Sequence, residues 1–178
     1  MTSTIDAATV DTPVGPLALL VHDDVLVAAG FADIEAHYDR LARDARSEPA
    51  PLRRVAGLGA FTTALSAYVD GDLTAPDTLP VAQGGGPFWQ AAWKVMREVP
   101  PGETITYAEL ATRAGNENAV RAAGSACAQN RIAPVIPCHR ILRTGGKLGG
   151  YYYGLDTKEW LLAHERRVKR SAGADPGD

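Results

Sequence analysis

The sequence predicts an α/β protein of the α+β kind, with a small N-terminal domain of β-sheet and helix followed by a mostly helical C-terminal domain. Two apolar runs near the N-terminus are typical of strands, and apolar residues at helical spacing dominate the second half. Between them, residues 70–87 hold three prolines and four glycines, a composition typical of a linker. We therefore expect an N-terminal domain over residues 1–85, a C-terminal domain over 86–170 and a disordered tail over 171–178.

The first half contains a hairpin pattern and two helical patterns. In GPLALLVHDDVLVAAGF, two apolar runs flank Asp23 and Asp24, which predicts a β-hairpin with its turn at these residues. Residues 34–46 mix apolar and charged residues at helical spacing, and the following SEPAP ends the expected helix. A second helix is expected over residues 52–69. Its apolar face would carry Phe61, Leu65 and Tyr68.

The second half opens with PFWQAAWKVMREV, whose leading proline suits the first turn of a helix. Thr106 and Glu109 then match a capping box, which predicts a helix over about residues 107–114. Another helix is expected over about residues 119–128. Two short helices joined by a glycine-containing turn are typical of a DNA-binding helix-turn-helix, although many helix pairs in enzymes share the pattern.

The helix expected over residues 119–128 is built from small side chains. Alanine, glycine and serine dominate it, and only Arg121 projects far from the backbone. One interpretation is tight packing against a neighbouring helix. The other is a helix that lies in a DNA groove, with Arg121 reaching further into the groove than its neighbours.

Composition favours a soluble protein of the cytoplasm. No apolar run is long enough to span a membrane, and the first residues lack the basic and apolar regions of a signal peptide. Two cysteines, Cys127 and Cys138, make no disulfide framework, which favours a reducing compartment. The same two cysteines and four scattered histidines show no zinc-ligand spacing, so we expect no metal.

Charge is divided unevenly along the chain. Residues 1–86 carry five basic and twelve acidic side chains (net −7), residues 87–170 carry thirteen basic and seven acidic ones (net +6), and the last eight residues carry two acidic ones. The whole chain has a net charge of −3, but its second half is basic. Such asymmetry is typical of nucleic acid binding, and it also occurs on an ordinary solvated surface.

The stretch IPCHRI places a cysteine beside a histidine and an arginine. A thiol reacts as its thiolate and has an unperturbed pKa of about 8.5, so a nucleophilic Cys138 would need a base to take its proton. His139 is the adjacent candidate, and Glu165 is the natural residue to orient that imidazole. The sequence lacks the C-x-x-C of a redox motif and the second cysteine of a zinc deaminase. The other interpretation is a small buried hydrophobic residue.

These residues resemble the O6-alkylguanine-DNA alkyltransferases, a family of DNA repair proteins. The resemblance covers about residues 86–166, and the first 85 residues match loosely, chiefly in TPVGPLALLV. The blocks that carry it stand in the order and spacing of the family: PFWQAAWKVMREVPPGETITYAELA, NAVRAAGSACAQN, PVIPCHRI and GGYYYGLDTKEWLLAHE.

The resemblance implies a self-alkylating reaction. Cys138 would accept the alkyl group irreversibly, and each molecule would act once. His139 would take the thiol proton through a water molecule, and Glu165 would orient the imidazole. Tyr107 would help to rotate the nucleotide out of the duplex and would donate a proton toward the leaving guanine. Asn130 would brace the turn before the active-site segment.

The resemblance also implies a winged-helix-like DNA-binding motif, double-stranded DNA with O6-alkylguanine as partner, a monomer and no cofactor. Arg121 would replace the extruded base in the duplex. The other implied DNA contacts are Ala119, Gly124 and Tyr107. The implied substrate pocket is formed by Ile141, Tyr151, Tyr152 and Tyr153, with the backbone of Cys138.

Two departures from the family pattern have consequences. Tyr152 and Tyr153 stand where the family usually has small residues, so we expect a bulkier pocket rim that slows large adducts more than methyl. Some relatives carry zinc in the N-terminal domain, whereas no cysteine precedes residue 127 here. Cys127 is expected to be buried and inert, and one interpretation of Lys158 is a surface charge.

Two other functions fit parts of the sequence. A lesion-sensing, alkyltransferase-like protein would flip the base without transfer, but such relatives replace the cysteine that is present here as Cys138. A helix-turn-helix transcription regulator would use the same helix pair, with the cysteine playing no part.

Overall fold

The computed structural model describes residues 3–45 and 48–173, and the chain separates into two compact units. Unit 1 comprises Met1–Gly84 with Arg131–Val135, and unit 2 comprises Gly85–Asn130 with Ile136–Asp178. Arg131–Val135, which the sequence places in the C-terminal domain, thus groups with the N-terminal one. The backbone explains this difference, because the amide of Ala29 donates to the carbonyl of Arg131 at 2.8 Å and the amide of Ala133 donates to the carbonyl of Ala29 at 3.1 Å.

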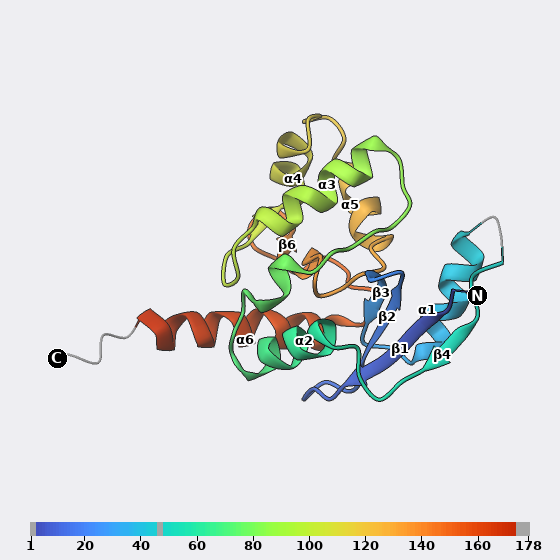
Figure 1. The fold of residues 1–178 in the computed structure, drawn as a ribbon. Helices are drawn as coiled ribbons and strands as arrows, with labels where there is room; N and C mark the ends of the chain where they lie inside the picture. The colour runs from blue at the N-terminus through green and yellow to red at the C-terminus, as the bar shows by residue number, and fades with distance from the viewer. Residues whose placement is uncertain (1–2, 46–47, 174–178) are drawn as a thin grey trace. The chain divides into compact units, whose positions relative to one another are not determined.

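Unit 1 contains a four-stranded sheet in the order β3-β2-β1-β4 (Figure 1). Its strands are β1 (Ile5–Val10), β2 (Leu17–His22), β3 (Val25–Gly30) and β4 (Leu52–Arg54). Strand β2 pairs antiparallel with both β1 and β3, whereas β4 runs parallel to β1. The expected hairpin is confirmed: Asp23 and Asp24 connect β2 to β3 with φ angles of 49° and 63°. Two successive positive φ values suit a tight turn whose twist matches that of the strands, and aspartate tolerates them better than most residues do.

Two helices accompany this sheet. Helix α1 (Ile34–Asp44) confirms the expected helix. Asp33 is its N-cap, and the carboxylate of Asp33 accepts a hydrogen bond from the amide of Ala36 at 2.7 Å. The helix expected over residues 52–69 is wrong in its first part, since Leu52–Arg54 pairs with β1 and α2 spans only Ala60–Asp70. A short 3₁₀ turn, η1 (Ala75–Thr78), interrupts the linker. The core joins the sheet to α1 and contains Ile5, Ala7, Ala18, Leu20, Ala28 and Ile34.

Unit 2 is mostly helical, as expected. Its elements are α3 (Pro87–Glu98), β5 (Ile105–Thr106), α4 (Tyr107–Arg113), α5 (Val120–Ala128), η2 (Cys138–Arg140), β6 (Ile141–Leu142) and α6 (Leu155–Gly173). Thr106 is the N-cap of α4, because its hydroxyl accepts the amide of Glu109 at 3.1 Å. Helices α4 and α5 pack together as the helix-turn-helix pair, and β5 pairs in parallel with β6.

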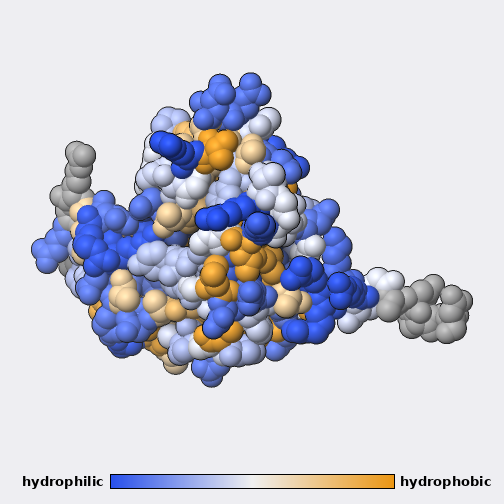
Figure 2. Space-filling model, turned by 180° about the vertical axis from the view of Figure 1, so that it is seen from behind, coloured by the Kyte–Doolittle hydropathy of each residue, from blue (hydrophilic) through white to orange (hydrophobic). Residues whose placement is uncertain are grey.

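Helix α6 extends further than the sequence indicates. The disordered tail is expected from residue 171, but 171–173 belong to the last turn of α6, and 174–178 lie outside the described residues. None of the helices in the described ranges is both long and apolar enough to cross a membrane. On the face drawn in Figure 2, hydrophobic residues are interspersed with hydrophilic ones. The large hydrophobic side chains that are exposed in the described part are Val120, Tyr152 and Leu155.

Candidate active site

Cys138 lies at the start of a single 3₁₀ turn rather than on a strand. The amide of Cys138 donates to the carbonyl of Ile136 at 2.9 Å, and the amide of Arg140 donates to the carbonyl of Pro137 at 3.0 Å. A 3₁₀ turn has three residues per turn, so consecutive side chains do not point to opposite faces as they do on a strand. This turn buries Cys138, His139 and Arg140 together in the interior of unit 2.

The cavity that Cys138 lines has a volume of about 490 Å³. Helix α5 forms one wall, with Arg121, Gly124 and Cys127, and the first residue of α4, Tyr107, also lines it. The segment before α6 adds residues 149–152. Among the described residues, two arginines and no acidic residue line the cavity. A volume of this size is typical of pockets that take small molecules or single nucleobases.

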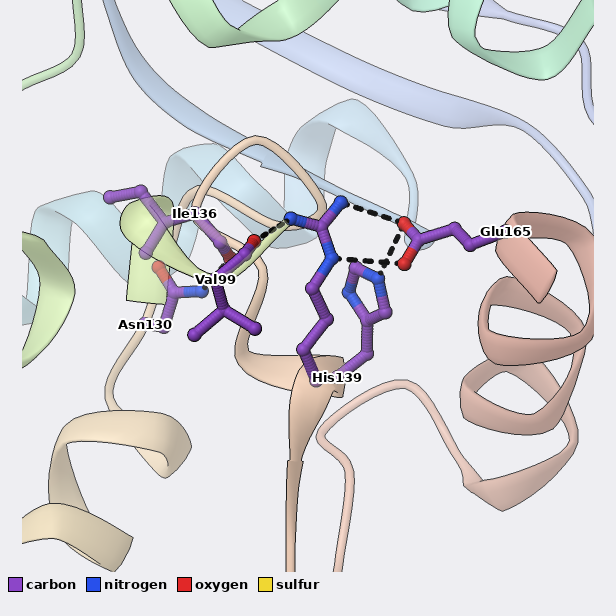
Figure 3. A network of polar contacts seen from close by, with 6 residues as sticks. Val99, Asn130, Ile136, His139 and Glu165 are labelled. Carbon is purple, nitrogen blue, oxygen red and sulfur yellow. Dashed lines mark hydrogen bonds and ion pairs between the residues drawn. The ribbon is translucent and has the colours of Figure 1, made fainter. Parts of the chain in front are cut away.

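His139 and Glu165 form a buried pair next to Cys138. Nε2 of His139 lies 3.0 Å from Oε2 of Glu165, and neither side chain is exposed (Figure 3). Because the carboxylate accepts a hydrogen bond from Nε2–H, the neutral imidazole carries its proton on Nε2. Its Nδ1 is therefore the atom that can accept a proton. Burial is the main cause that lowers the pKa of His139, and the Glu165 charge offsets it only in part. The imidazole is therefore neutral, and able to accept a proton, near neutral pH.

Arg140 holds the same carboxylate. Its Nε donates to Oε1 of Glu165 at 2.9 Å, its Nη2 donates to Oε2 at 2.8 Å, and its Nη1 donates to the carbonyl of Val99 at 2.7 Å. Burial opposes ionisation of Glu165, but the hydrogen bonds from His139 and Arg140 and the Arg140 charge outweigh it and lower the pKa of Glu165. Glu165 is therefore a fixed anion that orients the imidazole.

Asn130 closes the loop that leads to the cysteine. Its side-chain amide donates to the carbonyl of Ile136 at 2.8 Å, and Asn130 itself is buried (Figure 3). Residues 131–135, which lie between Asn130 and Ile136 in the chain, belong to unit 1. The bond therefore fixes the chain at the point where it returns toward Cys138.

Tyr107 stands in the cavity with its phenol protonated. Burial, followed by the neighbouring Cys127 and Cys138, raises its pKa to about 12, against a smaller opposing effect of Arg143. A Cβ atom placed on Gly149 would lie 2.9 Å from Cε2 of Tyr107 and closer still to its hydroxyl oxygen. The ring thus packs directly on the Gly149 backbone, which only glycine allows.

Lys158 is a site residue that the sequence interpretation missed. The interpretation of Lys158 as a surface charge is wrong, because its side chain is fully buried. Its Nζ donates to the carbonyl of Ile141 at 3.0 Å and to the carbonyl of Gly150 at 3.4 Å. Burial lowers the pKa of Lys158, and the nearby Cys138 and Cys127 oppose that shift. Its position directly before the EWLLAHE block, three and four residues from the buried Leu161 and Leu162 and so on their face of the helix, was the available signal.

Comparison with known proteins gives matches over most of the chain. A family model described as "6-O-methylguanine DNA methyltransferase, DNA binding domain" matches residues 87–167. The methylated-DNA–protein-cysteine methyltransferase of Shigella flexneri is 35% identical over 158 residues, 86% of this chain and 91% of that protein. The protein of the same name from Mycolicibacterium paratuberculosis is 39% identical over 92% of this chain and 93% of its own.

The chain belongs to the methylated-DNA–protein-cysteine methyltransferase family. The fold agrees: the crystal structure of Mycobacterium tuberculosis OGT in complex with DNA matches with a TM-score of 0.77 and 32% identity, over 92% of this chain and 94% of that one. The resemblance inferred from the sequence blocks is thereby confirmed, and so is the α+β fold class with its helical C-terminal part.

The structure brings together most of the residues that the sequence singles out. Cys138, Tyr107, Arg121, Gly124, Tyr151 and Tyr152 line one cavity, and His139, Glu165 and Asn130 lie buried in the same unit. Three residues lie elsewhere. Ala119 is the N-cap of α5, Tyr153 packs edge-on against Tyr151 and Tyr152 outside the cavity lining, and the carbonyl of Ile141 accepts from Lys158.

The pocket rim and Cys127 also differ from expectation. Tyr152 is the ring at the rim, and it is 56% exposed. Cys127 is partly exposed and lines the cavity, and burial raises the pKa of its thiol well above the usual value, which favours the protonated thiol over the thiolate. In the described part of the chain, no three histidine, cysteine, aspartate or glutamate residues gather as metal ligands do.

Proposed function

We propose that this protein repairs DNA by transferring the alkyl group of O6-alkylguanine, chiefly O6-methylguanine, to its own Cys138. The observation that carries the proposal is the position of Cys138 at a cavity sized for a nucleobase, next to a buried His139–Glu165 pair. Membership of the family supports it, since curated relatives with 35–39% identity are methylated-DNA–protein-cysteine methyltransferases.

The reaction is a displacement at the alkyl carbon. Nδ1 of His139 takes the thiol proton through a bridging water, and the sulfur of Cys138 forms a bond to the alkyl carbon as its bond to O6 breaks. The electron pair of that bond remains on the guanine, which Tyr107 protonates. The raised pKa of Tyr107 keeps that proton available. Because the product is a stable thioether, the protein acts once and needs no cofactor.

Access to O6 requires the nucleotide to leave the duplex. The alkyl group lies within the base stack, and extrusion costs a few kcal/mol. Arg121, on α5 and at the cavity, would fill the space left in the stack, and the small residues Ala119 and Gly124 would allow α5 to approach the groove. Asn130 would hold the loop before Cys138, and Tyr151 and Tyr152 would border the bound base.

We further propose that the protein works as a monomer in the cytoplasm. Both of its cysteines are free thiols, and a nucleophilic thiol persists in a reducing compartment.

A substrate-excess experiment tests the function. The protein is mixed with a several-fold molar excess of duplex that carries O6-methylguanine, and the restored guanine is counted by nucleoside chromatography. We expect the reaction to stop when one guanine per protein has been restored. Restoration of many guanines per protein, or of none with binding intact, contradicts the proposal.

A further inference from the structure

Arg143 is a cavity residue to which neither the sequence patterns nor the proposed reaction gives a role. It follows β6 in a tight loop, in which its amide donates to the carbonyl of Lys147 at 2.9 Å and its carbonyl accepts the amide of Gly146 at 3.0 Å. Gly145 and Gly146 adopt positive φ angles of 85° and 79°, which allow the chain to turn so sharply. The loop fixes the backbone from which the side chain of Arg143 extends.

The guanidinium of Arg143 is positioned for an external anion. The side chain is exposed, lines the cavity with Cys138 and Tyr107, and forms no ion pair with a carboxylate of the described residues. None of the described residues that line the cavity is acidic, so none of them neutralises the charge of Arg143. Its charge reaches the cavity, because it opposes the rise in the pKa of Tyr107.

We propose that Arg143 binds a backbone phosphate beside the nucleotide that enters the cavity, and so holds that nucleotide in position for transfer. The planar guanidinium pairs well with phosphodiester oxygens and keeps its charge at any physiological pH. The inference rests on the proposed function.

The position of Arg143 favours a phosphate over an anionic group on the adduct itself. The adduct must reach the sulfur of Cys138, which is only 6% exposed, and so lies at the buried end of the cavity. Arg143 is exposed and therefore lies at the solvent end. The sugar-phosphate backbone of an extruded nucleotide also remains at that end.

The test measures single-turnover methyl transfer by Arg143→Gln, Arg143→Lys and the wild type. The matched control is Lys147→Gln, which removes an exposed charge from the same loop but outside the cavity. Three substrates are used: duplex with O6-methylguanine, the same duplex with neutral methylphosphonates flanking the lesion, and free O6-methylguanine base.

We expect Arg143→Gln to react about tenfold more slowly with the ordinary duplex at sub-saturating concentration, which corresponds to about 1.4 kcal/mol. The slope of log affinity against log salt should fall by about 0.9, the value for one lost phosphate contact. Reaction with the free base should fall much less than reaction with the duplex, because the base carries no phosphate and loses only the small effect of the Arg143 charge on Tyr107. Methylphosphonates should slow the wild type to the rate of Arg143→Gln and should not slow that variant further, whereas Arg143→Lys and Lys147→Gln should keep most of the wild-type rate.

Several results overturn the inference. An equal loss with free base would make Arg143 a structural residue of the cavity, and an equal methylphosphonate effect in both proteins would mean that it binds no phosphate. A larger loss on duplex with O6-carboxymethylguanine than with O6-methylguanine would assign its charge to the adduct. If the wild type takes no methyl group from duplex or base, the proposed function fails instead.

Discussion

Both oxygens of Glu165 accept a hydrogen bond from the guanidinium of Arg140, one at 2.9 Å from Nε and one at 2.8 Å from Nη2. The same carboxylate also pairs with His139, the proposed proton acceptor. One buried anion therefore holds both the Arg140 guanidinium and the His139 imidazole. Changes to Glu165 should therefore affect stability and transfer together.

Glu165→Gln should destabilise the fold by roughly 3–5 kcal/mol, because it leaves the buried charge of Arg140 without its counter-ion. Urea unfolding measures the loss. Glu159→Gln is the matched control, since Glu159 is exposed on the same helix and its loss should stay within about 0.5 kcal/mol. Similar unfolding free energies for the two variants would mean that the Glu165–Arg140 pair contributes nothing net.

The pH dependence of transfer should follow the lowered pKa of His139. Neutral imidazole is the reactive form, so the rate should stay on its plateau at pH 6.5, where an ordinary histidine would be half protonated, and fall only below it. A single-turnover rate profile from about pH 5 to 8 measures this. A rate already halved at pH 6.5 would contradict a buried, neutral His139.

Stability should change with pH in the same direction. The folded state holds a proton on His139 less tightly than the unfolded chain does, so the free energy of unfolding is fully retained above pH 6.5 and decreases as pH falls from 6.5 toward the lower pKa of the folded state. Glu165, whose folded pKa is also lowered, adds stability above pH 4.5 that is lost on further acidification. Unfolding free energies that rise on acidification over this range would contradict both directions.

Gly149→Ala should slow transfer on the order of 10- to 100-fold by displacing the ring of Tyr107 from its reactive position. The comparison is Gly150→Ala, whose added Cβ meets no atom within 4 Å. Single-turnover rates on duplex measure both variants, and circular dichroism verifies the fold. If Gly149→Ala reacts as fast as Gly150→Ala, the packing of Tyr107 on this loop is not needed for transfer.

Lys158→Met should destabilise the fold by about 1–3 kcal/mol, since the buried carbonyl of Ile141 loses its donor. It should also slow transfer, because the charge of Lys158 favours the thiolate of Cys138. Lys94→Met, on the exposed side of α3, is the control. Wild-type stability and rate in Lys158→Met would assign the lysine no part in the site.

Local patterns predicted the elements whose signals are themselves local. The hairpin at Asp23 and Asp24 and the cap at Thr106 depend on residues within a few positions of each other, and both are present. The error at Leu52–Arg54 has the opposite origin, since its strand exists only through pairing with β1, more than forty residues earlier. Arg131–Val135 groups with unit 1 for the same reason, since its backbone bonds to Ala29 join positions about a hundred residues apart.

The candidate site shows the same division. Residue type alone identified three of the candidate residues: a thiol is typical of a nucleophile, an imidazole of a base and a carboxylate of the group that orients it. These are Cys138, His139 and Glu165. Lys158 was not identified in this way, because a lysine is read as exposed unless tertiary structure supplies its carbonyl partners. Arg143 was missed because only the folded loop brings it to the cavity.

The location of the transferred methyl group tests the central claim most directly. After reaction with duplex that carries O6-methylguanine, the protein is digested and the peptides that contain Cys127 and Cys138 are weighed by mass spectrometry. We predict one added methyl group on Cys138 and none on Cys127, full transfer in Cys127→Ser, and none in Cys138→Ser although that variant still binds the duplex. A methyl group on Cys127, or transfer that survives in Cys138→Ser, would contradict the account.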